Sequence, residues 1–433
     1  MLVSPRRYLP EKAFLRKLFA LASGTIAGQG IVVASSPLLT RLFTPAEFGQ
    51  FAVLAAVIAI TGIAACWRFE FAIPVIRDDQ AAAAMVLVAS IVATLMALLT
   101  ALAVLTFGQW FVELVDAEQL AGWLWLLPFA VILWGLGCIG SYWSLRRGTY
   151  RLNGVNRALT AGSQATGQVL LGFLATGAPG LIIGYIIGYV VRFVHYFATT
   201  TTNDRLLCRQ QRLPEVWHVA RANWRYPVFS APASLLHTIC EMAPAIAIAA
   251  LFGPATAGWY ALAQRLMALP VKFVGEAASQ VFLGEGRSLI GANLYRFFLR
   301  TTALFIILGI IGMLPLLLFA PMLFALVFGE DWREAGVIVQ LLVPLHLARF
   351  VAIPVSQTLI VLRRQDLQLI YSFLNLFVFF ITFLVSYIID LSAGTTIFIF
   401  SVGSGAIFAA EIAVSWYLAA RGQQIGLRVG RDD

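Results

Sequence analysis

The chain consists of repeated stretches of about twenty or more apolar residues, separated by mostly short polar connections. Of its 433 residues, 60% are hydrophobic and only 12% are charged, and the mean hydropathy is +0.86. A soluble domain carries about 25% charged residues, whereas about 20 consecutive apolar residues suffice to cross a bilayer as a helix. The sequence therefore predicts an all-α, polytopic membrane protein.

The apolar stretches predict about twelve membrane-spanning helices in two pseudo-symmetric six-helix bundles. We expect an N-terminal bundle at 1–205, a cytoplasmic linker at 206–226 and a C-terminal bundle at 227–433. The predicted spans are residues 18–38, 47–66, 80–107, 120–143, 155–176, 179–200, 227–251, 256–280, 299–327, 336–361, 367–389 and 394–419.

The positions of the 30 Lys and Arg residues predict the orientation. Most lie in the N-terminal segment and in every second connection, whereas the other connections hold only Arg41 and Arg333. Because cytoplasmic loops carry the excess of basic residues, both termini are expected in the cytoplasm. Residues 1–17 would then form a cytoplasmic tail; a cleaved signal peptide, the alternative, has a shorter apolar core of about 7–15 residues. The net charge of +9 is spread between the spans and does not indicate nucleic-acid binding.

A charged motif follows the first predicted span and resumes after the second. Thr44 is expected to cap a helix that begins at Pro45, where a proline loses no hydrogen bond. The motif consists of TRLFTP (40–45), EFG (47–49), RFE (68–70) and AI (72–73).

This order and spacing resemble the N-terminal signature of bacterial polysaccharide flippases, whose superfamily also contains multidrug antiporters and lipid II flippases. The resemblance implies a transporter, not an enzyme, in the bacterial inner membrane. It would flip a polyprenyl-diphosphate-linked oligosaccharide by alternating access, for O-antigen, capsule or exopolysaccharide assembly beside a separate polymerase. Its partners would be the lipid-linked oligosaccharide and the bilayer, with no cofactor, and we expect a monomer.

Two segments suggest an internal repeat. LFTPAEFGQFA (42–52) and LFGPATAGWYA (251–261) share Leu, Phe, Pro, Ala, Gly and Ala at matching places. Each joins the first and second span of its bundle, so both copies lie on the same side of the membrane. The sequence therefore predicts a parallel repeat, as in one of the known transporter plans.

The span predicted at 256–280 contains Arg265, Lys272 and Glu276. On an α-helix these residues fall within about 40° of one another, with Pro270 expected to kink the helix between them. We expect them to line a water-filled cavity, with Arg265 and Lys272 binding substrate and Glu276 near a coupling ion. Lys272 and Glu276 can pair; alternatively, each charge extends to its own membrane interface.

Other charges extend this predicted site. His237 and Glu241, four residues apart, form a candidate ion-coupling pair, or a packed polar pair that fastens the span to a neighbour. Arg349 is expected inside the protein as a substrate-binding residue. Glu411 is a further candidate coupling residue, or a partner for a neighbouring helix.

Two arginines in the motif are also candidate substrate-binding residues. The alternative for Arg41 is a local contact with Glu47. The alternative for Arg68 is an ion pair with Glu70, which requires the helix to end there, because residues two apart on a helix do not face each other.

Several function classes lack support in the sequence. There is no Walker A motif, no HExxH and no nucleophile elbow, so neither ATP-driven transport nor a familiar hydrolase is indicated. The four cysteines have no metal-site spacing. A multidrug or organic-cation antiporter remains an alternative, although such a pump favours an acidic cavity. A membrane polysaccharide polymerase is a further alternative, although it would need a large outer loop.

Overall fold

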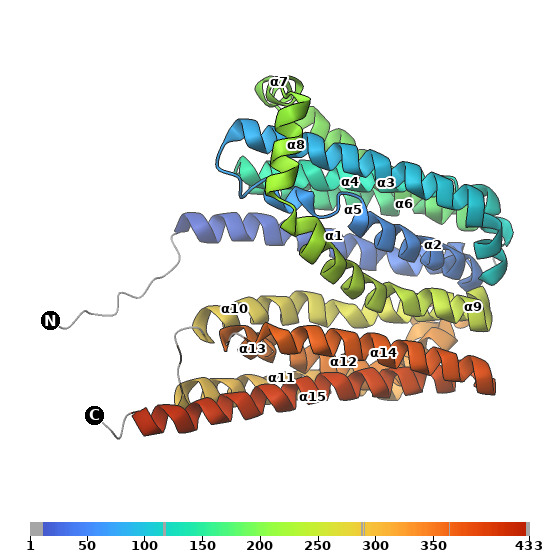
Figure 1. Ribbon diagram of the computed structural model, residues 1–433. Coiled ribbons are helices and arrows are strands. Elements are labelled where there is room, and N and C mark those ends of the chain that lie inside the picture. Colours follow the sequence, from blue (N-terminus) through green and yellow to red (C-terminus); the bar gives the residue numbers. More distant parts are fainter. Residues whose placement is uncertain (1–11, 116–117, 287–288, 290, 363, 430–433) are drawn as a thin grey trace. The chain divides into compact units, whose positions relative to one another are not determined.

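The computed structural model describes residues 12–115, 118–286, 289, 291–362 and 364–429, which form helices and their connections (Figure 1). Nine helical segments within these ranges are long and apolar enough to cross a membrane. One of them, residues 226–285, includes both spans predicted at 227–251 and 256–280. The all-α polytopic prediction is confirmed. The count of twelve stays a prediction, because the helices at 18–38 and 155–176 are not among the nine.

The first half of the chain contains α-helices and two short 3₁₀ segments, η1 and η2. Residues 1–11 of the predicted tail lie outside the described residues. The elements are α1 (Lys12–Leu42), α2 (Pro45–Ala64), η1 (Phe69–Ala72), α3 (Asp79–Leu114), η2 (Glu118–Trp123), α4 (Leu126–Arg146), α5 (Tyr150–Phe173), α6 (Ala178–Thr199), α7 (Thr202–Arg209) and α8 (Leu213–Ala222).

The second half has the same helical character, with two π-helical turns, η3 and η4, and one 3₁₀ turn, η5. The elements are η3 (Tyr226–Ser230), α9 (Ala231–Pro270), η4 (Val271–Gly275), α10 (Glu276–Gly286), α11 (Ala292–Phe328), η5 (Glu330–Trp332), α12 (Arg333–Val355), α13 (Gln357–Val361), α14 (Gln365–Ile389) and α15 (Ala393–Val429).

Contacts divide the chain into two compact units. Unit 1 contains Met1–Phe43 and Leu54–Ile239, and unit 2 contains Thr44–Val53 and Cys240–Asp433. The first turns of α2 are therefore grouped with the second half of the chain. The domain limits predicted from the sequence stay a prediction.

In unit 1, α5 packs between α1 and α6, while α4 packs against α3 and α6. The contact between α1 and α5 depends on two glycines: a Cβ atom on Gly24 would overlap the backbone of Gly154. The short helix α8 runs across α3 rather than along it and buries Val216 and Val219 (Figure 1). The cytoplasmic linker predicted from the sequence therefore contains ordered helices.

In unit 2, α12 packs against both α11 and α15. A Cβ atom on Gly336 of α12 would lie 2.5 Å from the Ala320 carbonyl oxygen of α11, so the two helices approach closely at this glycine. Phe282, Phe298 and Val355 form a buried cluster, joining α10, α11 and α12. The core of this unit therefore surrounds α12.

In both copies of the predicted repeat, the helix is interrupted just before the proline. In the first copy, the Thr44 hydroxyl accepts a hydrogen bond from the Glu47 amide (3.3 Å) and the Glu47 carboxylate accepts one from the Thr44 amide (2.7 Å). This capping box starts α2 at Pro45, as predicted. In the second copy, Gly253 occupies the place of Thr44, and its φ of 82° breaks α9 just before Pro254. Glycine is favoured at this position because residues with a side chain rarely adopt a positive φ.

Candidate functional site

An ion pair inside predicted membrane spans is the main feature of unit 2. The Arg349 guanidinium of α12 donates a hydrogen bond to the Glu241 carboxylate of α9. The arginine side chain is 20% exposed and that of the glutamate 32%. The other Arg349 N–H groups have no acceptor among the described residues, although a guanidinium carries five donors. Arg349 can therefore bind a further anion while Glu241 holds it in place.

A second polar contact joins the same two helices. His346 lies one turn before Arg349 on α12 and is fully buried. Its Nε2 atom is 2.9 Å from Oε1 of Gln264 on α9, a hydrogen-bond distance. Tyr260, one turn before Gln264, is also buried. Thus α12 is hydrogen-bonded to α9 on both sides of the break at Gly253. Neither His346 nor Gln264 was predicted as a site residue; a histidine inside an apolar span was the available signal.

The predicted charged face of residues 265–276 is not continuous. Arg265 is partly buried and makes other interactions. Lys272 and Glu276 are both exposed, and within the described chain no ion pair joins them. Of the two alternatives left open, the Lys272–Glu276 pair is not formed, because η4 is a π-helical turn that follows Pro270. A π-helix bonds residue i to i+5, so residues four apart no longer align.

The predicted coupling pair is also rearranged. Glu241 is paired with Arg349, as described above, and His237 is exposed. Arg41 lies exposed in the last turn of α1. Its alternative partner, Glu47, is used in the capping box of α2. The roles assigned to these residues in binding and coupling stay predictions.

Arg68 and Glu70 do contact each other, since α2 ends at Ala64 before the motif begins. Arg68 adopts a left-handed conformation with φ 63°, which directs its Nη1 to within 3.6 Å of Glu70 Oε1. Its guanidinium also lies over the Phe71 ring, 4.5 Å from the centroid. Burial raises the pKa of the Glu70 carboxyl, and Arg68 opposes this shift. The ion-pair alternative from the sequence is therefore confirmed.

A larger network at one end of unit 1 was missed by the sequence reasoning. Arg146, at the end of α4, donates to the carboxylate of Asp79 (2.6 Å) and to the carbonyls of Ile73 (3.0 Å), Ile76 and Arg77 (3.1 Å). It thereby fastens the segment between η1 and α3. The sequence contained a signal for this network. Arg146 and Arg147 follow the span predicted at 120–143, and Asp78 and Asp79 precede the neighbouring span at 80–107 on the same side of the membrane.

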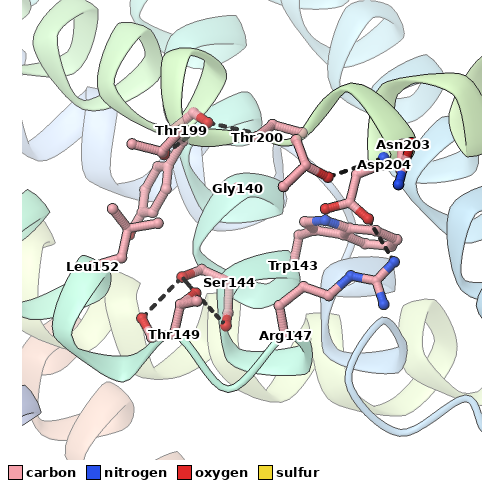
Figure 2. Close-up of a pocket in the computed structure, with 12 residues that line it drawn as sticks. Gly140, Trp143, Ser144, Arg147, Thr149, Leu152, Thr199, Thr200, Asn203 and Asp204 are labelled. Carbon is pink, nitrogen blue, oxygen red and sulfur yellow. Dashed lines mark hydrogen bonds and ion pairs between the residues drawn. The ribbon is translucent and has the colours of Figure 1, made fainter.

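Arg147 extends this network to α7. It reaches Asp79 at 2.9 Å and Asp204 at 2.5 Å. Figure 2 shows Arg147, Asp204 and the hydroxyl pair Ser144–Thr149 around a cavity of about 360 Å³. Because both acids already compensate the positive charge of Arg147, this cavity is not a strong anion site. The network is best understood as a structural clasp.

The described residues contain no group of three His, Cys, Asp or Glu side chains arranged to hold a metal ion. All four cysteines are free thiols. The chemistry available in unit 2 is therefore that of a guanidinium, a carboxylate, an imidazole and an amide.

A helical chain with many apolar spans and with charged side chains paired inside them is a multi-pass membrane protein. The family follows from a direct match: a model described as "Polysaccharide biosynthesis protein" matches residues 38–337, and the chain belongs to this family. No curated protein matches the chain by sequence.

Solved structures share the fold along nearly the whole chain. One is an inward-facing multidrug-resistance MATE-family transporter of the MOP superfamily, with 13% identity, a TM-score of 0.65, and coverage of 94% of this chain and 98% of that one. Another is the lipid II flippase MurJ in an inward closed conformation, with 11% identity, a TM-score of 0.68, and coverage of 96% and 92%. These structures show the shared fold, and the match over residues 38–337 confirms the polysaccharide family resemblance noted in residues 40–73.

Proposed function

We propose that this protein flips a polyprenyl-diphosphate-linked oligosaccharide across the bacterial inner membrane by alternating access. Its products would serve O-antigen, capsule or exopolysaccharide assembly, beside a separate polymerase. Both termini would lie in the cytoplasm and the working unit would be a monomer. The observation that carries the proposal is Arg349: a guanidinium within a membrane span, in a polysaccharide biosynthesis family member, with donors still available.

The chemistry of the substrate supports this choice. The head group must cross about 30 Å of hydrocarbon, and its diphosphate is the part that water solvates most strongly. Arginine binds phosphate through a planar fork of N–H groups, which gives both charge and geometry. Glu241 would hold the guanidinium in position until phosphate arrives. Release of Glu241 from Arg349 would then be the step that a proton or ion gradient drives.

The test is to measure lipid-linked glycan on each leaflet in cells that depend on this protein. Loss of the protein should leave polyprenyl-diphosphate glycan at the inner leaflet. Arg349→Ala should reproduce this accumulation, Arg349→Lys should restore part of the flipping, and the exposed control Arg300→Ala should leave it unchanged. Normal flipping by Arg349→Ala would remove Arg349 from the mechanism.

A multidrug antiporter is the second candidate, favoured by the fold shared with a MATE-family transporter. It predicts efflux of cationic dyes from intact cells. Dye efflux without any effect on lipid-linked glycan would overturn the flippase proposal. Unpolymerised glycan accumulating outside the membrane would instead indicate a polymerase.

A further inference from the structure

Glu411 of α15 differs from the other acidic groups in predicted membrane spans. The residue is only 8% exposed, and within the described chain its carboxyl makes no hydrogen bond or ion pair. By contrast, Glu241, in the span predicted at 227–251, faces an arginine. An ionised carboxylate without a partner is strongly disfavoured in such surroundings. The position therefore demands either a bound cation or a proton.

Among the described residues, no positively charged side chain of the helices around α15 pairs with this carboxyl. α15 packs against α11, α12, α13 and α14. From α14, the titratable group that interacts electrostatically with Glu411 is Tyr371, which is itself 8% exposed. On α11, Tyr295 accepts a hydrogen bond from Trp416 at 3.2 Å instead. No charged side chain described on α11, α12, α13 or α14 acts electrostatically on Glu411.

Two further polar groups in this region also lack partners. Ser415 lies one turn after Glu411 on the same face of α15 and is fully buried. Thr358 of α13 is also fully buried, and α13 contacts α15. Within the part of the chain that the structure describes, the hydroxyl oxygens of both residues have no hydrogen-bond partner. Buried polar groups are nearly always satisfied, so the unpartnered carboxyl of Glu411 and the buried hydroxyl of Ser415, one turn apart on the same face of α15, together point to a ligand.

We infer that Glu411 is a proton-binding site that loads and unloads during the transport cycle. The reaction is the addition of one proton to the carboxylate, giving a neutral carboxylic acid that can donate to a neighbouring hydroxyl. This inference rests on the proposed transport function for its role, but the site itself does not need a substrate. It assigns coupling to a group separate from Glu241, whose charge is balanced by Arg349.

The first test uses dicyclohexylcarbodiimide, which modifies protonated carboxyls in apolar surroundings, on the purified full-length chain. Mass spectrometry should find the adduct on Glu411, with a rate that falls about tenfold per pH unit above half-protonation. Glu411→Gln should abolish this adduct, while Glu276→Gln, at an exposed position, should retain it. An unmodified Glu411 at acidic pH, in a folded protein, would overturn the inference. Protection by Na⁺ would also overturn it, because the occupant would then be a metal ion.

The second test separates this inference from the proposed function. In vesicles containing lipid-linked glycan, Glu411→Gln should lose the dependence of flipping on a proton gradient, and Glu411→Asp should keep it. Size-exclusion profiles identify any variant that fails to fold. If Glu411 reacts as expected but no glycan is flipped by the wild type, the site stands and the flippase proposal fails. If Glu411→Gln flips with unchanged gradient dependence, the coupling role fails alone.

Discussion

Gly49 and Gly258 face each other across a reciprocal contact between the two copies of the repeat. A Cβ atom on Gly49 would lie 2.9 Å from the Gly258 nitrogen, and one on Gly258 would lie 3.0 Å from the Gly49 nitrogen. Each would also overlap the carbonyl of the proline four residues before the other glycine, Pro254 or Pro45. Such reciprocity is expected when two like segments meet about a two-fold axis.

Gly49→Ala and Gly258→Ala should each destabilise the protein by about 1–3 kcal/mol, because the added methyl group has backbone on its far side and cannot be accommodated by a rotamer change. Thermal unfolding of the purified protein in detergent measures the effect. Gly312→Ala is the matched control in the same unit, since a Cβ there meets nothing within 4 Å; it should keep or slightly raise the melting temperature. Equal behaviour of all three variants would contradict the close contact.

The Arg349–Glu241 pair should show energetic coupling in a double-mutant cycle. With side chains 20% and 32% exposed, we expect about 1–3 kcal/mol between Arg349→Ala and Glu241→Ala, since a partly buried pair is screened less than a surface pair. The exposed pair Arg333–Glu330, with exposures of 50% and 70%, is the reference and should show little coupling. Additive effects at Arg349 and Glu241 would show that the contact does not persist in solution.

Arg146→Ala should cost about 3 kcal/mol of unfolding free energy, because it removes charge-assisted hydrogen bonds to Asp79 and to several carbonyls of the connection. Arg151→Ala, at an exposed position nearby in sequence, should have almost no effect. Chemical unfolding followed by tryptophan fluorescence can compare the two. A loss no larger than that of the control would mean that the clasp contributes nothing to stability.

Glu70 should make stability depend on pH. Since its folded pKa is raised by burial, the folded state holds the proton more tightly than the unfolded chain, and stability falls as pH rises from the ordinary value of 4.5 through the folded value. Glu70→Gln should remove this fall in stability. The melting temperature of the variant minus that of the wild type should therefore increase as the pH is raised from acidic to neutral. The exposed Glu334→Gln is the control. If this melting-temperature difference between Glu70→Gln and the wild type decreased as the pH rises, the Glu70 pKa would be lowered rather than raised in the folded state.

Local features were the most predictable from the sequence. Thr44, Pro45 and Glu47 define a helix start whose hydrogen bonds all lie within one turn. Asp78 directly precedes the next helix, and its side chain accepts a hydrogen bond from the Ala81 amide at 2.7 Å, an N-cap within one turn. The break between the two spans in α9 was predicted near its actual position at Gly253. Such features need only neighbouring residues, so composition and spacing suffice.

The candidate site was less predictable, because a charged residue in a span has several possible partners. Glu241 was paired with His237 four residues away, but it contacts Arg349 from another helix. Lys272 and Glu276 were paired on α-helical spacing, but a π-helical turn separates them. Arg146 and Asp79 were not predicted as a pair, although they form one of the shortest ion pairs in unit 1.

The sequence alone therefore determined the membrane-spanning class and the local helix starts, because hydropathy and short-range hydrogen bonds act within a few residues. Only the tertiary structure decided which charges meet, where two glycine backbones touch, and which carboxyl is left without a partner. Those outcomes depend on contacts between residues far apart in the sequence, with separations of 67 for Arg146 and Asp79 and 108 for Arg349 and Glu241. Packing selects among such contacts, and no local pattern encodes that choice.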